Sequence, residues 1–239
     1  MSEKNKNGCT IALIIVIAIP LVCFILFDYF DHHRPELSTQ TCLPIYGPKE
    51  PFPSKDKNGK DIVDTAYFKV PDFSFTNQNG ITITQDSMNG KVTVVDFFFT
   101  TCKSICIDMT ANLRMIQDHF VNDRDVLILS HTVDPETDSV QQLFNYSVEN
   151  DINSKMWHLL TGDKKALYHQ ARYGYFITAD KGDGGPQDFI HDNHFVLVDK
   201  ERRIRGYYDG TDKASVNQMI KDIQMLLVSY IAPKKKVKK

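Results

Sequence analysis

The sequence predicts an α/β domain with a central mixed sheet flanked by helices, preceded by one N-terminal transmembrane helix. Three observations support this fold class. Strand-like apolar runs alternate with helix-like periodicity from residue 92 onward, hairpin patterns precede and follow that alternation, and an uncharged apolar run lies near the start of the chain. With 239 residues, 42% hydrophobic and 24% charged, the chain can form one large domain with a packed core.

The apolar run at residues 10–27 carries no charge and is about long enough to cross a bilayer as a helix, for which ~20 residues are usual. No small-residue cleavage site follows it, so we expect an uncleaved anchor rather than a signal peptide. Lys4 and Lys6 precede the run and Asp28 follows it. The positive-inside rule therefore places residues 1–9 in the cytoplasm and the rest of the chain outside.

Three further segments are expected from composition. Residues 28–64 are rich in Pro, Lys, Gly and Ser, which predicts a linker, and the folded domain is expected at 65–232. Residues 233–239 are a basic tail, most simply a solvated one. The formal net charge of -2 gives no general attraction to nucleic acid, so no nucleic-acid partner is expected.

The domain is expected to begin with a hairpin, because alternating residues flank the turn-forming residues 77–80. Strands are then predicted at 92–99, 125–130 and 157–160, each followed by a helix, at 104–120, 140–148 and 164–173; strands at 195–199 and 203–208 and a helix at 213–229 complete the domain. This order predicts a parallel core sheet with helices on both faces and antiparallel strands at one edge.

Cys102 and Cys106 lie between the strand at 92–99 and the helix that follows it. A helix N-terminus stabilises negative charge and therefore favours thiolates. Reactive cysteines after the first central strand are the layout of a thioredoxin-like domain, although the spacing is one residue longer than Cys-x-x-Cys. An incidental pair of buried structural thiols is the plainer alternative.

The pair permits metal binding, redox chemistry or both. If the first turn is helical, positions i and i+4 share a face and both sulfurs can reach one metal ion; if the turn opens, the pair can close a disulfide. Two thiolates are too few for a closed zinc site. They suit copper, as Cu(I) or Cu(II), when a nitrogen ligand joins them.

Eight histidines could supply that nitrogen. His131 follows a strand at its carboxyl end, where open α/β sheets place their sites. His191 and His194 lie just before the strand at 195–199, after a Gly-rich loop, and the residue pattern does not decide between them. The remaining histidines are expected to be solvated, packed or at the surface: His32, His33, His119, His158 and His169.

Three segments together resemble the Sco (SenC) family of membrane-anchored copper proteins. Residues 99–106 are similar to the family's Cys-x-x-x-Cys segment, and residues 133–138 to its Asp-Pro-Glu loop. The third segment is a histidine eight residues before the aspartate that begins a hairpin turn; counting back from Asp199 gives His191. Lys103 and Ile107 depart from the family, which often has proline after each cysteine.

The resemblance implies that Cys102, Cys106 and His191 bind copper, with one ion expected per chain. It implies a metallochaperone that delivers copper to, or matures, the binuclear copper centre of cytochrome c oxidase. Its partners would be the copper-bearing oxidase subunit and other copper chaperones or thiol–disulfide reductants. The location would be the bacterial cytoplasmic membrane, with the soluble domain on the periplasmic side. The alternative is a thiol–disulfide oxidoreductase that uses Cys102 and Cys106 alone.

Overall fold

The computed structural model describes residues 19–22, 24, 43–55, 57, 59–177 and 192–231. The chain divides into two units, Met1–Cys42 and Leu43–Lys239. In the first unit the described residues, 19–22 and 24, are helical. No helix within the described ranges is long and apolar enough to span a membrane. The predicted anchor at 10–27 falls mostly outside these ranges and stays a prediction.

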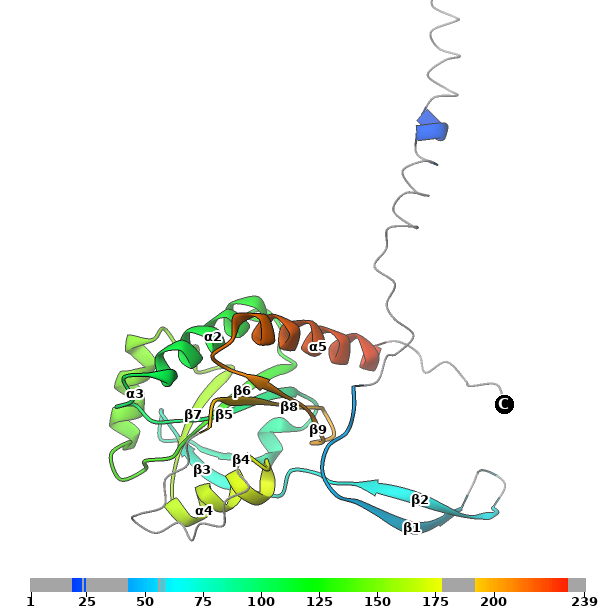
Figure 1. The fold of residues 1–239 in the computed structure, drawn as a ribbon, viewed down its shortest axis with the longest axis horizontal. Coiled ribbons are helices and arrows are strands. Elements are labelled where there is room, and N and C mark those ends of the chain that lie inside the picture. The colour runs from blue at the N-terminus through cyan, green and yellow to red at the C-terminus, as the bar shows by residue number, and fades with distance from the viewer. Residues whose placement is uncertain are drawn as a thin grey trace, which may run out of the picture. The chain divides into compact units, whose positions relative to one another are not determined.

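The elements of the second unit are shown in Figure 1. In chain order they are β1 (Lys49–Lys55), β2 (Asp61–Tyr67), β3 (Ser74–Asn77), β4 (Thr82–Thr84), the short helix η1 (Gln85–Met88), β5 (Val92–Phe98), α2 (Ile105–His119), β6 (Val126–Thr132), α3 (Val140–Glu149), β7 (Trp157–Thr161), α4 (Lys164–His169), the π-turn η2 (Gln170–Gly174), β8 (His194–Val198), β9 (Ile204–Asp209) and α5 (Lys213–Ile231).

Seven of the strands in the described ranges form one sheet in the order β4-β3-β7-β6-β5-β8-β9. Strands β5, β6 and β7 are parallel, as the alternation of strands and helices predicts. Antiparallel strands were expected at one edge but occur at both, because β3 pairs antiparallel with β7 and β8 pairs antiparallel with β5. Each terminal hairpin therefore extends a different edge of the parallel core.

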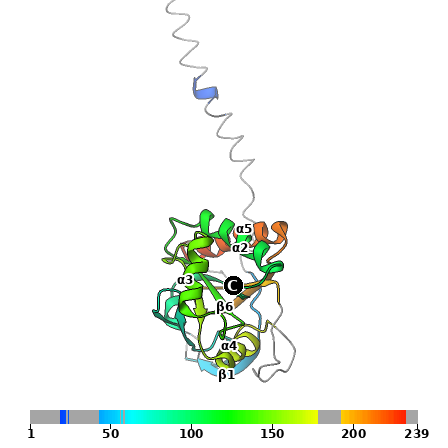
Figure 2. The same ribbon diagram turned by 90° about the vertical axis from the view of Figure 1, so that its left-hand side faces the viewer.

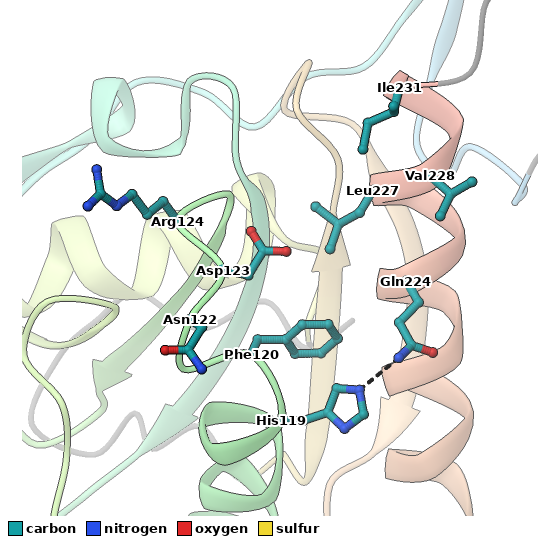
Figure 3. Close-up of a pocket in the computed structure, with 9 residues that line it drawn as sticks. All are labelled: His119, Phe120, Asn122, Asp123, Arg124, Gln224, Leu227, Val228 and Ile231. Carbon is teal, nitrogen blue, oxygen red and sulfur yellow. Dashed lines mark hydrogen bonds between the residues drawn. The ribbon is translucent and has the colours of Figure 1, made fainter.

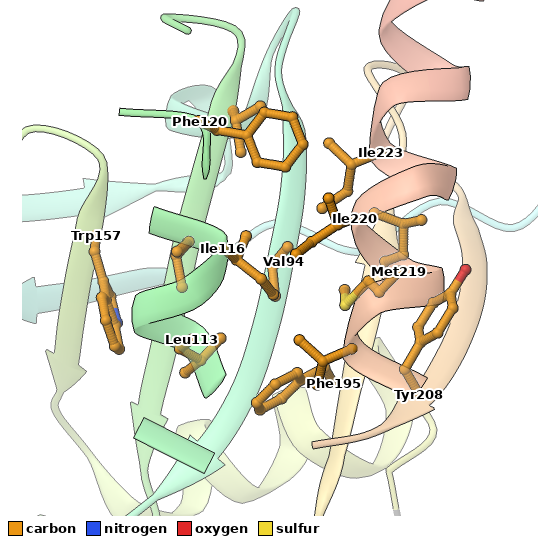
Figure 4. Close-up of a cluster of buried hydrophobic side chains, with 14 of the residues drawn as sticks. Val94, Leu113, Ile116, Phe120, Trp157, Phe195, Tyr208, Met219, Ile220 and Ile223 are labelled. Carbon is orange, nitrogen blue, oxygen red and sulfur yellow. The ribbon is translucent and has the colours of Figure 1, made fainter. Parts of the chain in front are cut away.

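Both faces of the sheet are covered (Figures 1 and 2). Helices α2 and α5 pack on one face, and α4 lies on the other. All seven residues of β5 are buried, which confirms the predicted central strand. Figure 4 shows the first face, where Leu113 and Ile116 of α2 meet Met219 and Ile223 of α5 above Val94 of the sheet. This packing fixes the start of α2, and so Cys106, relative to the end of β5.

A two-stranded ribbon overlaps the segment expected to be a linker, residues 28–64. β1 pairs antiparallel with β2, from Lys49 opposite Tyr67 to Lys55 opposite Asp61, and most of its side chains are exposed. The sequence did not indicate β1 as a strand because it contains proline at two positions, and proline occurs in sheets mainly in edge strands.

The base of the ribbon is fixed to the domain. Arg205, buried in β9, donates hydrogen bonds to the carbonyl oxygens of Leu43 and Pro44, and Asp199 pairs with the same guanidinium at 2.8 Å. The amide of Tyr46 donates to the carbonyl of Ile204 at 2.9 Å. Residues 43–46 are therefore attached to β9 within the second unit.

Candidate functional site

The two cysteines lie on the loop that joins β5 to α2. Cys102 precedes the helix and is partly exposed, whereas Cys106 lies in the first turn of α2 and is buried, with 4% of its surface accessible. Both are free thiols. The turn is therefore open rather than helical at Cys102, which is the arrangement expected to allow a disulfide. The two side chains are close enough to change each other's acidity.

The two thiols differ in acidity. Burial opposes ionisation of Cys102, but hydrogen bonds from the Cys106 thiol and from Ser104 outweigh it and lower the pKa of Cys102. Burial raises the pKa of Cys106 to about 12, and the hydrogen bond to Cys102 adds to the rise. Cys102 is thus the more readily ionised thiol of the pair, and Cys106 stays protonated at neutral pH.

A buried carboxylic acid lies on β5, and its charge contributes to the raised pKa of Cys106. This is Asp96, and burial raises its pKa to about 7. It accepts a hydrogen bond from Ser130, whose hydroxyl accepts one from the indole of Trp157 at 2.8 Å. Sequence reasoning missed Asp96, although an aspartate inside an otherwise apolar strand was a visible signal.

A second buried carboxylate, Asp138, holds the cysteine loop from the other side. It accepts hydrogen bonds from the amide and hydroxyl of Thr100 and from the hydroxyl of Thr132. Burial raises its pKa, and these hydrogen bonds oppose the rise. Ser139 caps the next helix, which leaves the Asp138 carboxylate available to bind Thr100.

The third ligand implied by the resemblance, His191, lies outside the described residues. Strand β8 runs antiparallel to β5 and therefore begins at the sheet end where β5 reaches the cysteine loop. His194 is exposed and its ring lies 3.0 Å from the Asp192 carboxylate. Within the described ranges no three His, Cys, Asp or Glu side chains are grouped to hold a metal ion.

His131, considered from its position at a strand end, faces away from the cysteines. Successive residues of β6 point to opposite faces, so Ile128 packs on the face that holds Cys106, while His131 packs on the other face among Phe97 and Tyr175. Burial lowers the pKa of His131 to about 3. It is a neutral core residue.

The other histidines in the described part of the chain have structural partners. His158 lies 3.3 Å from the amide of Asn77, and His169 packs on Tyr173. His119 ends α2 and lies 2.7 Å from the side-chain amide of Gln224. His32 and His33 lie outside the described residues.

A groove of about 550 Å³ lies beside His119, between the C-terminal ends of α2 and α5 (Figure 3). Thirteen residues of helix separate it from Cys106, which corresponds to about 20 Å along the axis. The groove is therefore remote from the thiols and forms no part of the candidate site.

The chain is similar to known proteins. The SCO1/SenC family model matches residues 64–228. The SCO1 protein homolog of Bacillus subtilis (strain 168) is 30% identical over 167 residues, which cover 70% of this chain and 86% of that protein.

Two solved structures are also similar. BsSco, a member of the Sco family of cytochrome c oxidase assembly proteins in which a disulfide switch was identified, is 30% identical with a TM-score of 0.56, covering 66% of this chain and 93% of that one. Arabidopsis thaliana ScoI with copper bound is 26% identical with a TM-score of 0.53, covering 66% of this chain and 99% of that one. These structures confirm the thioredoxin-like α/β fold, and the chain belongs to the SCO1/SenC family.

Proposed function

We propose that this protein is a copper chaperone that binds one copper ion through Cys102, Cys106 and His191. The observation that carries the proposal is the pair of free thiols at the start of α2, whose side chains change each other's acidity, in a chain of this family. The donor set fits copper, since two thiolates and one imidazole suit both Cu(I) and Cu(II). That a relative was solved with copper bound supports the same conclusion.

We further propose that the copper is destined for cytochrome c oxidase, with the subunit that carries the binuclear copper centre as partner. Membership in a family described through BsSco as oxidase assembly proteins supports this assignment. Loading requires both cysteines to be reduced, because a disulfide removes both sulfur ligands. The protein therefore also needs a thiol–disulfide reductant or a copper donor as partner.

Thiol–disulfide exchange is the second candidate function, and the unequal acidity of the cysteines favours it. The Cys102 thiolate would attack a target disulfide and release one target thiol, forming a mixed disulfide. Cys106, once deprotonated, would displace the second target thiol and close the Cys102–Cys106 disulfide. Two electrons pass to the target, and His191 is not required.

The two functions separate at His191. We expect full-length protein to bind one copper ion, and His191→Ala to lower the copper affinity more than tenfold because the nitrogen ligand is lost. His194→Ala is the matched control, since His194 is exposed and paired with Asp192. Copper stoichiometry and competition with a chromophoric chelator measure both variants. If His191→Ala binds copper as the unchanged protein does, the ligand assignment is wrong.

We propose that residues 10–27 anchor the chain in the bacterial cytoplasmic membrane and that the copper-binding domain lies outside the cytoplasm. The uncharged run and the lysines that precede it support this orientation. Alkaline phosphatase fused after residue 239 should then be active in intact cells. An inactive but stable fusion would show that the domain is cytoplasmic.

A further inference from the structure

The strongest unassigned feature is a carboxylate that ties the cysteine loop to two other elements. Asp138 lies in the loop between β6 and α3 and has no solvent-accessible surface. Its helix-capping role is taken by Ser139, whose hydroxyl accepts the amide of Gln142 at 3.2 Å. The carboxylate is therefore available for contacts outside its own helix.

In the described part of the chain, the Asp138 carboxylate accepts four hydrogen bonds, and three of them come from one residue. The amide of Thr100 lies 3.3 and 3.2 Å from its two oxygens, and the hydroxyl of Thr100 donates at 2.5 Å. The fourth comes from the hydroxyl of Thr132 at the end of β6. Burying a carboxylate costs free energy that only such bonds offset, so the contact with Thr100 dominates the environment of Asp138.

Thr100 stands two residues before Cys102. Its hydroxyl also accepts a hydrogen bond from Gln142 at 3.3 Å, and the amide of Cys102 donates to the carbonyl of Phe99 at 3.3 Å. The bond from Cys102 to Phe99 closes a turn that contains Thr100, and Thr100 is held by Asp138.

We infer that Asp138 is a positioning residue for the cysteine pair: by holding Thr100, its carboxylate fixes where the Cys102 sulfur stands relative to Cys106. It touches neither sulfur in the described contacts and acts through the loop. The inference rests on the proposed function only in that this pair is taken as the functional one; it holds equally for copper binding and for disulfide exchange.

Asp138→Asn tests the inference. The asparagine side chain has the same shape, but its NH2 group donates where the carboxylate oxygen accepted, so it opposes the donors of Thr100 and Thr132 and hydrogen bonds are lost. Glu136→Gln is the matched control, since it removes the same charge from an exposed position of the same loop. Both are made in full-length protein with Cys9, Cys23 and Cys42 replaced by serine, so that only the pair reacts.

Two properties of the pair are measured: its affinity for Cu(I), by chelator competition, and the equilibrium constant for its disulfide against glutathione. We expect Asp138→Asn to lower each about tenfold, the scale typical of residues that orient ligands, while Glu136→Gln changes neither. A purely structural role would instead shift the midpoint of thermal unfolding and leave both constants of the folded protein unchanged. That result, or equal constants in the two variants, would overturn the inference.

Thr100→Val keeps the inference testable if Asp138→Asn does not fold. It removes the hydroxyl partner and should lower the same two constants. Where both variants fold, their effects should not add in the double variant, because each breaks the same link; additive effects would contradict the proposal. If the unsubstituted protein binds no copper but the glutathione constant responds to Asp138→Asn, the copper function has failed and the positioning role stands.

Discussion

At the scale of single residues, the environment of each ionisable side chain decides its role more than its place in the sequence does. Cys102 and Cys106 have the same chemistry, yet hydrogen bonding lowers the pKa of one and burial raises that of the other. His131 illustrates the same point in the core. It lies against four aromatic rings, and burial keeps it neutral well below its ordinary pKa.

Replacing His131 should make the protein more resistant to acid. The pKa of His131 is about 3 in the folded protein against 6.5 ordinarily, so the unfolded chain binds a proton that the folded one excludes. This side chain therefore costs about 1.4 kcal/mol of stability for each pH unit below 6.5, down to about pH 3. Phenylalanine suits the aromatic surroundings, and His131→Phe should remove that loss.

Urea unfolding at pH 7 and pH 5 measures the effect, as the difference between His131→Phe and the unchanged protein. The comparison matters because Asp96 works in the opposite direction: its raised pKa of about 7 means that the folded protein gains stability as the pH falls towards 3.8. When the pH is lowered from 7 to 5, the free energy of unfolding of His131→Phe should fall by about 2 kcal/mol less than that of the unchanged protein. Equal losses would contradict the assignment.

At the scale of elements, the end of β6 and the start of α3 form one unit with the cysteine loop. Ser139 caps α3 and so frees Asp138, and Asp138 joins Thr132 of β6 to Thr100 of the loop. The capping bond is therefore part of what supports the site, although it makes no contact with it.

Ser139→Ala should lower the free energy of unfolding by about 1 kcal/mol, because the amide of Gln142 loses its acceptor. Ser147→Ala on the same helix is the control: its hydroxyl donates back to the carbonyl of Phe144, a bond that adds little to helix stability. Urea denaturation of both variants measures the difference. If Ser139→Ala were no less stable than Ser147→Ala, the capping assignment would be wrong.

At the scale of the whole molecule, most of the core elements could be predicted from the sequence, whereas the contacts between distant segments and the exposed ribbon could not. Strand β5 and helix α5 were predicted because their apolar periodicity is local, and the apolar stripe of α5 is buried as expected. The role of Asp138 was not, because its partner Thr100 lies 38 residues away and becomes a neighbour only in the folded chain. The ribbon was missed because its strands are mostly exposed and β1 contains proline at two positions.

The hydrogen bonds from Arg205 to Leu43 and Pro44 limit how far the domain could extend from a membrane. They attach the chain to β9 at residue 43, so roughly fifteen residues would separate the domain from the anchor predicted to end at residue 27, and that length cannot exceed about 50 Å. Attachment only at residue 64 would allow up to about 130 Å. If the predicted anchor is present, the cysteine loop can meet only partners whose sites lie close to the membrane surface.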